Sequence, residues 1–158
     1  MFRELTRKKQ VLTDEECVRI LINERRGVLS VNGDNGYPYG MPMNHYYNEK
    51  DGCIYFHQGK IGHRLDSLRK DDRVSYCVYD KGERKEGEWA YLVKSVIIFG
   101  RVEILDDFNT INEISRAISA NFTLDELYVE KEIEKYAKAT QILKLTPEHI
   151  CGKRVKEE

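Results

Sequence analysis

The sequence predicts a mainly β protein with flanking helices, in which six antiparallel strands close into a small barrel. After a leading helix, the spacing of apolar residues changes at Gly27 from a helical period to the two-residue period of strands. Short turns rich in glycine and asparagine then join consecutive strands, and such turns favour antiparallel pairing. A chain of 158 residues is expected to form one domain, residues 1–158.

The chain is expected to start with a basic, partly extended arm over residues 1–12, followed by a helix. Thr13 can cap the first turn, and Glu16 completes the pattern of a capping box. The apolar residues that follow recur at helical spacing. Gly27 is expected to end this helix.

Three strands are expected next, at residues 27–32, 37–47 and 53–57, with turns at 33–36 and 48–52. The middle strand alternates in composition along its whole length: one face would carry Tyr37, Tyr39, Met41, Met43, His45 and Tyr47, and the other Pro38, Gly40, Pro42, Asn44 and Tyr46. It also contains two prolines, which cannot donate to a ladder, so we expect an irregular or partly unpaired edge.

Helices and strands alternate in the second half of the chain. The expected elements are a short helix with Ile61, Leu65 and Leu68 on one face, strands at 73–79 and 94–105, a helical insertion at 106–140, and a final strand at 141–145. Gly100 inside the long strand indicates a bulge or a close backbone approach. Pro147 is expected to end the last strand.

Composition and charge exclude several classes of function. The 26 Lys and Arg residues are balanced by 27 Asp and Glu, so charge gives no reason to expect a nucleic-acid partner. No apolar run reaches the roughly 18 residues of a membrane span, and no secretory signal is evident. The cysteines are widely spaced without a C-x-x-C motif. This pattern favours small core side chains in a reducing, cytoplasmic setting over a disulfide framework or a zinc site.

The most informative segment runs from Tyr55 to Arg64. A strand ends, a loop with glycines turns, and a helix begins with Lys60, His63 and Arg64 beside its N-terminus. Free backbone N–H groups, the positive helix end and three potential cations suit a phosphate monoester. A plain strand-to-helix turn with solvated charges would explain the same residues.

A second segment, residues 40–46, combines Met and Pro on a strand. It would offer an apolar surface, and freed backbone groups, to a flat ligand with a polar rim; an edge strand packed with Met and Tyr is the alternative. Because the phosphate loop follows one hairpin later, a flat heterocycle carrying a phosphate fits both segments. Flavin mononucleotide (FMN) is the candidate.

The stretch from Arg26 to Tyr76 resembles the FMN-binding split-barrel superfamily. Within it, the chain is most similar to the pyridoxamine 5′-phosphate oxidase-related branch of the 5-nitroimidazole-resistance (Nim) proteins. The motifs G-x-P-x-N at residues 40–44 and F-H-x-x-x-x-G-H-[KR] at residues 56–64 carry the resemblance. It implies a six-stranded split barrel and a homodimer with two FMN sites at the subunit interface.

Position by position, the resemblance implies a set of cofactor-binding residues. They are Lys60, Gly62, His63 and Arg64 at the FMN phosphate, Met43 and Asn44 against the isoalloxazine, and Phe56 and His57 beside the ribityl chain. Residues 89–95, which begin with Trp89, would complete the site from the partner subunit. The W-x-R-L-x-P ending of true pyridoxamine phosphate oxidases is missing, which argues against oxidation of vitamin B6.

The expected function is that of an FMN-dependent reductase or oxidase that passes electrons to a small planar acceptor such as a nitroimidazole. NAD(P)H would be a transient donor, since no G-x-G-x-x-G fingerprint is present. Tyr37, Tyr39, Tyr46 and Trp89 are candidates for an aromatic wall. No catalytic acid or base stands out, and the flavin supplies the redox chemistry itself. A non-catalytic protein that holds flavin, or holds haem through His45 or His57, is the alternative.

Overall fold

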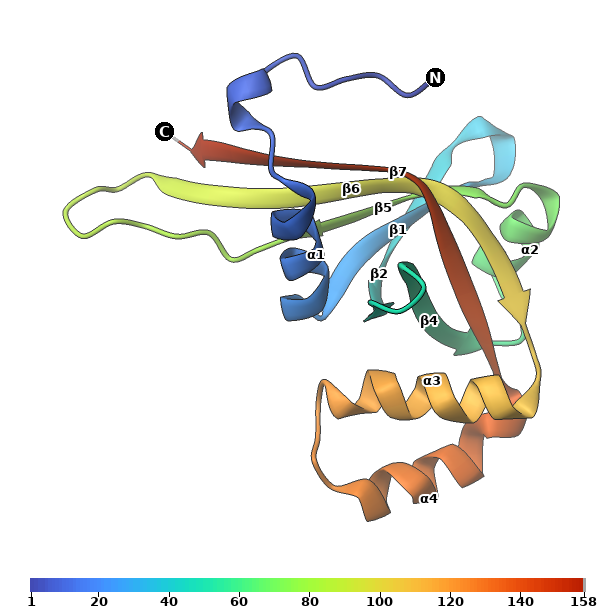
Figure 1. Cartoon of the computed structure of the whole chain (residues 1–158). Helices are drawn as coiled ribbons and strands as arrows, with labels where there is room; N and C mark the ends of the chain where they lie inside the picture. Colours follow the sequence, from blue (N-terminus) through green and yellow to red (C-terminus); the bar gives the residue numbers. More distant parts are fainter. Residues whose placement is uncertain (158) are drawn as a thin grey trace.

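The computed structural model describes residues 1–157, which form a curled antiparallel sheet with helices packed around it (Figure 1). The helices are η1 (Lys8–Gln10), α1 (Asp14–Asn23), η2 (Asp34–Gly36), α2 (His63–Lys70), α3 (Phe108–Ala120), α4 (Glu126–Tyr136) and η3 (Ala137–Ala139). The strands are β1 (Arg26–Asn32), β2 (Pro38–Asn44), β3 (Tyr46–Asn48), β4 (Cys53–Gly59), β5 (Arg73–Tyr79), β6 (Tyr91–Leu105) and β7 (Thr140–Glu157).

The strands form one sheet in the order β2-β1-β5-β6-β7-β4-β3, with antiparallel neighbours throughout. Strands β2 and β3 are therefore its two edges. The sheet curls into a half-barrel, and this arrangement confirms the split-barrel prediction. The expected unpaired edge is the outer side of β2, which pairs only with β1.

The sheet has seven strands where six were expected, because the predicted strand at residues 37–47 divides at His45. Before His45, β2 pairs with β1; after it, β3 pairs with β4. The alternation in the sequence continues through this point, so it gives no sign that the chain changes partner. The buried His45 side chain marks the division.

The last strand is much longer than predicted and passes through Pro147. In the β6–β7 ladder Phe99 faces His149 whereas Gly100 faces Pro147, so Glu148 is an extra residue in a bulge. Pro147, which has no N–H, is accommodated at this irregularity. A Cβ at Gly100 would overlap the carbonyl oxygen of Thr146, which explains the glycine. Both strands bend sharply near here in Figure 1, and the bend curls the sheet.

The helix boundaries follow local chemistry. The predicted capping box is present: Glu16 N–H donates to Thr13 Oγ1, and Thr13 N–H donates to Glu16 Oε2. Helix α1 ends at Asn23 because Glu24 takes an extended backbone, so the prediction that Gly27 ends it was wrong; Gly27 lies inside β1. Ile61 lies outside α2 and is 92% exposed, so only Leu65 and Leu68 anchor that helix.

Residues 1–157 form two hydrophobic clusters, one on each side of β4. The half-barrel interior contains Leu29, Phe56, Tyr76 and Leu143, and α1 closes it with Cys17, Ile20 and Leu21. A second cluster packs α3 and α4 against the other face of β4 and β7, through Tyr55 and Ile142. Strand β4 is thus buried on both faces up to Phe56 and opens only at its end, where the predicted site begins.

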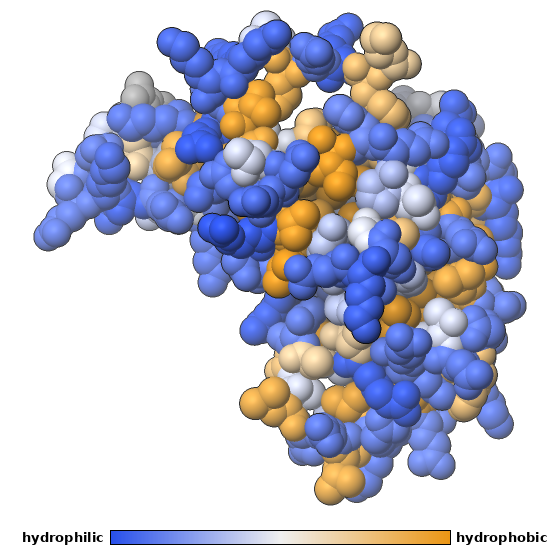
Figure 2. Space-filling model, in the orientation of Figure 1, coloured by the Kyte–Doolittle hydropathy of each residue, from blue (hydrophilic) through white to orange (hydrophobic). Residues whose placement is uncertain are grey.

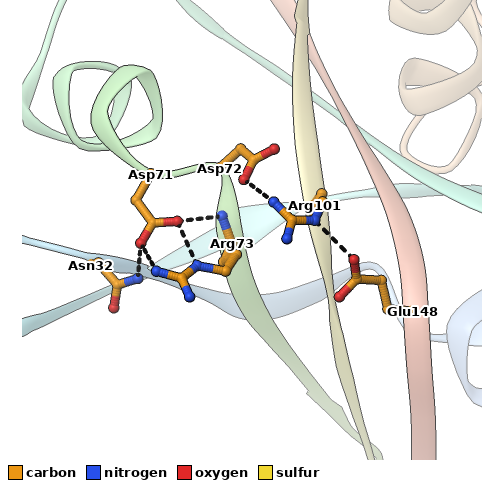
Figure 3. Close-up of polar contacts among 6 residues, drawn as sticks. All are labelled: Asn32, Asp71, Asp72, Arg73, Arg101 and Glu148. Carbon is orange, nitrogen blue, oxygen red and sulfur yellow. Dashed lines mark hydrogen bonds and ion pairs between the residues drawn. The ribbon is translucent and has the colours of Figure 1, made fainter. Parts of the chain in front are cut away.

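Asp71 and Asp72 join α2 to β5. Polar contacts that start from these two residues reach three other strands, β1, β6 and β7 (Figure 3). Asp71 accepts from the side chains of Arg73 and Asn32, and Asp72 accepts from Arg101, which also binds Glu148. These bonds hold the C-terminal end of α2 against β1, β6 and β7. No helix within residues 1–157 combines the length and apolar character needed to cross a membrane.

Candidate functional site

The loop between β4 and α2 presents free backbone donors. The helix begins after Gly62, which has a φ of 133° and no side-chain cap. The first helical hydrogen bond runs from Asp66 N–H to Gly62 C=O, so the N–H groups of His63, Arg64 and Leu65 precede it. A Cβ at Gly59 or Gly62 would meet nothing within 4 Å. The loop is therefore an open cradle at the positive end of a helix.

The side chain of Arg64 extends from α2 to two buried residues of the half-barrel interior, Gln58 and Met43. Its Nε–H donates to Gln58 Oε1 at 2.6 Å, and its Nη1 contacts Met43 Sδ. Gln58 lies on β4 and Met43 on β2, so Arg64 connects two strands that are not neighbours in the sheet. Its side chain is half-buried and has no carboxylate partner within residues 1–157, and burial lowers its pKa. A guanidinium in this position favours an anion.

The other two predicted cations behave differently from Arg64. His63 stacks on Tyr39, with ring centroids 4.3 Å apart, and its Nε2 lies 3.4 Å from Asp34. The side chain of His63 therefore turns toward the β1–β2 turn, although its backbone N–H stays in the cradle. Lys60 is exposed at the tip of the loop and has no ion-pair partner in the part of the chain that the structure describes.

Met43 and Asn44 end strand β2 and point to opposite sides. Met43 is buried in the half-barrel interior, whereas Asn44 is half-buried and its Oδ1 accepts from Arg26 Nε at 2.8 Å. The structure thus brings Met43 to Arg64 and keeps Asn44 on the far side of the strand.

Phe56 and His57 are consecutive on β4 and so face opposite sides of the sheet. The Phe56 side chain is fully buried and packs edge-on against Tyr76, so any contact of this residue with a cofactor would involve its backbone. The His57 ring reaches solvent on the face that α3 and α4 partly cover. The residue is exposed, but partial desolvation by its neighbours, together with the charge of Arg64, lowers its pKa.

His45 is a structural residue. It is 1% exposed, and its Nε2–H donates to Leu21 C=O at 2.7 Å. Its Nδ1 must then accept from Tyr76 O–H, also at 2.7 Å, and burial lowers its pKa. Since both ring nitrogens have protein partners, His45 is not available as the haem ligand considered above.

The four predicted aromatic residues do not form one wall within the chain. Tyr39 stacks on His63, whereas Tyr46 packs beside the α3–α4 cluster. Tyr37 and Trp89 are exposed, at 75% and 71%.

A groove of about 1130 Å³ lies elsewhere, between α1, the start of β1 and the β5–β6 loop. Figure 2 shows this side of the molecule hollowed between the α3–α4 hairpin and the projecting loop between β5 and β6, here called the β5–β6 arm. Val28, Pro42 and Tyr79 line it together with Arg19, Arg25 and Arg26. None of the phosphate-loop residues takes part in this groove.

Sequence reasoning missed Gln58, although the signal was present. Ile54 and Phe56 face the interior, and the same alternation places Gln58, a polar residue, on that face. It also missed Asp34, whose position opposite His63 depends on the fold.

Comparisons with known proteins agree with the fold described above. A family model described as pyridoxamine 5′-phosphate oxidase matches residues 13–154. No curated protein matches the chain.

Solved structures with the same fold include three of low sequence identity. A proposed 5-nitroimidazole antibiotic resistance protein from Bacteroides thetaiotaomicron is 19% identical, with 93% of this chain and 87% of that chain covered and a TM-score of 0.76. The conserved protein Rv2991 from Mycobacterium tuberculosis is 17% identical, with 93% and 88% covered and a TM-score of 0.78. A FAD-binding protein from Mesorhizobium loti is 23% identical, with 92% and 97% covered and a TM-score of 0.68.

Proposed function

This chain belongs to the pyridoxamine 5′-phosphate oxidase family, and on that premise we propose that it is a flavoprotein that binds FMN through the cradle before α2. The observation that carries the proposal is Arg64, a half-buried cation without a carboxylate partner, beside an uncapped helix N-terminus. Membership of the family alone leaves the ligand open, because function depends on the site.

The cradle fits a phosphate monoester. Open space at Gly59 and Gly62, successive N–H groups and Arg64 together offer donors without a competing acid in contact with the guanidinium. Lys60 would add a further, solvated charge at the rim. His63 would contribute its backbone N–H, since its ring is stacked on Tyr39.

The ring system of the flavin would lie along the free edge of β2. This strand pairs only with β1, so its other edge leaves backbone groups available to the polar rim of an isoalloxazine. Met43 is buried beneath this end of the strand, so it would support the site from the interior, and the bond to Arg26 holds Asn44 in a defined position.

We propose that the bound flavin serves a reductase that passes electrons to a small planar acceptor such as a nitroimidazole, with NAD(P)H as a transient donor. The flavin supplies hydride or electron transfer, and the protein positions it and limits access to it. A flavin-binding protein without catalytic activity is the alternative.

Three measurements test this proposal. The purified protein should absorb near 370 and 450 nm, and titration of the apoprotein should show tighter binding of FMN than of FAD, because the sequence has one phosphate loop and no second one for an adenylate. Equal or tighter FAD binding would contradict the FMN assignment. Reoxidation by a nitroimidazole no faster than that of free reduced FMN would leave only the flavin-binding role.

The protein is also proposed to be a homodimer with the flavin at the subunit interface. The outer face of the sheet is uncharged and only half-covered along a row that crosses four strands: Val28, Cys77, Ile97 and Cys151. A second copy related by a two-fold axis would cover this face with the same face of its own. The exposed Trp89 on the β5–β6 arm would then reach the partner's site.

Sedimentation tests the dimer. The expected mass is twice 18.6 kDa. Ile97→Arg would place a charge at the centre of the row and should give a monomer that loses FMN. Cys53→Ser, a change within the α3–α4 cluster, is the control. A wild-type monomer that retains FMN would contradict the shared site.

A further inference from the structure

Gln58 is buried at a position where an apolar side chain would fit the pattern of the strand. It is 6% exposed, and the interior-facing residues before it on β4 are Ile54 and Phe56. Burying an amide is costly unless hydrogen bonds replace those made with water. The hydrogen bonds of this amide therefore indicate why it is there.

The only side-chain bond of Gln58 within residues 1–157 goes to Arg64. Gln58 Oε1 accepts from Arg64 Nε–H at 2.6 Å, whereas Nε2 is enclosed by protein and has no partner. The amide thus uses its acceptor on the guanidinium and leaves its donor unpaired. The bond occupies the Nε edge of Arg64, so the Nη2 donors remain free for another anion or acceptor.

The acceptor that Gln58 offers to Arg64 is neutral, and this affects the charge of Arg64 differently from a carboxylate. A glutamate here would neutralise Arg64 and repel a phosphate, whereas an amide oxygen orients the guanidinium and leaves its positive charge intact.

We infer that Gln58 is a positioning residue for the cofactor phosphate: it holds Arg64 in place without neutralising it, and so determines the preference for a phosphorylated flavin over riboflavin. This inference rests on the proposed function. Gln58 itself does not touch the ligand, because its free amide nitrogen is enclosed.

Gln141 provides a matched control on the facing strand. It lies directly opposite Gln58 in the β4–β7 ladder, is 8% exposed, and also has an unpaired amide atom, its Oε1. It forms no bond to Arg64. Replacing either amide removes a buried polar group of the same size from the same part of the interior, so the two differ in their relation to Arg64.

The test is fluorescence titration of flavin-free protein with FMN and with riboflavin, for the wild type, Gln58→Leu, Gln58→Glu and Gln141→Leu. The wild type should bind FMN more tightly than riboflavin. Gln58→Leu should reduce that preference about 10-fold by weakening FMN binding alone, and Gln58→Glu should reduce it further. Gln141→Leu should keep the wild-type preference. If Gln58→Leu does not fold, Gln58→Met gives the same comparison with an unbranched side chain.

The outcomes separate this inference from the proposed function. Wild-type protein that binds both flavins equally would overturn both. A wild-type preference that Arg64→Ala abolishes but the Gln58 variants retain would overturn the role of Gln58 alone. Equal losses for both flavins in Gln58→Leu and Gln141→Leu would mean that the buried amide is merely structural, which would also overturn it.

Discussion

The arginines near the two ends of helix α2 have different kinds of hydrogen-bond partner. At the C-terminal end, Arg73 binds Asp71, and Arg101 binds both Asp72 and Glu148 (Figure 3). At the N-terminal end, Arg64 is more buried, yet its partners are an amide and a thioether.

This difference is the one we expect between a structural junction and an anion-binding site. An acid already neutralises each arginine of the C-terminal network, so these cations have no need of a ligand. A half-buried cation without an acid is costly in the free protein and becomes favourable when an anion binds. The chain can pair its arginines with acids and does not do so at Arg64.

Among the variants that test this comparison, Arg64→Ala should cause the largest loss of FMN affinity. The loss of a charge-assisted hydrogen bond should weaken FMN binding by about 1.5–3 kcal/mol, or about 10- to 150-fold, while the fold survives. Titration of the apoprotein with FMN measures it. Arg101→Ala, a change on β6 in the network beside the C-terminal end of the helix, should leave FMN affinity unchanged; an equal loss in both variants would remove the distinction between the two ends.

Gly62→Ala should affect both the helix start and the cradle. A φ of 133° is strained for any residue with a Cβ, and the strain should cost about 1–3 kcal/mol. Urea unfolding should show the loss of stability, and FMN binding should weaken with it. Gly59→Ala places a methyl group in the same loop without a positive φ. If both variants bind FMN like the wild type, the cradle does not hold the phosphate.

Lys60→Ala should have a smaller effect, because the side chain is exposed and its charge is screened. We expect FMN affinity to fall by at most about 5-fold, and the loss should shrink as salt is added. Lys70, at the other end of the helix, already binds Asp34 at 3.1 Å, so Lys70→Ala should leave binding unchanged. If Lys60→Ala lost more FMN affinity than Arg64→Ala, then Lys60, and not Arg64, would be the main cation at the phosphate.

Asp71→Asn should have the smallest effect, and one on stability alone. Hydrogen bonds from Arg73 hold the pKa of Asp71 well below its ordinary value of 3.8. A carboxyl group with a lowered pKa stabilises the fold above its unfolded pKa, and this contribution is lost as the pH falls through the folded value. The variant should therefore melt slightly lower at pH 7, by less than about 4 °C, and match the wild type at strongly acid pH. Asp66→Asn, on helix α2, is the control. If Asp71→Asn and the wild type still melted at different temperatures in strong acid, the lowered pKa of Asp71 would not explain the difference.

Most of the fold could be predicted because it is encoded in local patterns. The capping box at Thr13 and Glu16 and the alternation of β1, β4 and β5 depend on neighbouring residues. Two features could not be read in this way. The division at His45 depends on which strands the chain pairs with, and β7 continues past Pro147 because Gly100 and a bulge across the ladder accommodate the ring.

The sequence predicted where the loop lies better than how its side chains are oriented. The spacing of Lys60, Gly62 and Arg64 predicted a loop before a helix N-terminus, and the structure places these residues at the start of α2; their role at a phosphate stays a prediction. The alternation of β4 would have assigned Phe56 to the core and Gln58 to the interior, yet the motif drew attention to Phe56 and His57. The orientation of His63 depends on Asp34 and Tyr39, which only the folded chain brings near.

The place of β7 in the sheet has a consequence for synthesis on the ribosome. Within residues 1–157, strand β4 pairs only with β3 and β7, and β7 is the last of these strands in chain order. Pairs such as Ile54 with Leu145 join residues far apart in the chain, and contacts of this kind form late and slowly. Until β7 has been synthesised, β3 and β4 therefore have no partner strand in the rest of the sheet. The loop that follows β4 is joined to the sheet through β4 only when β7 docks, so in a nascent chain this loop is ordered late, after the last of the described strands has emerged.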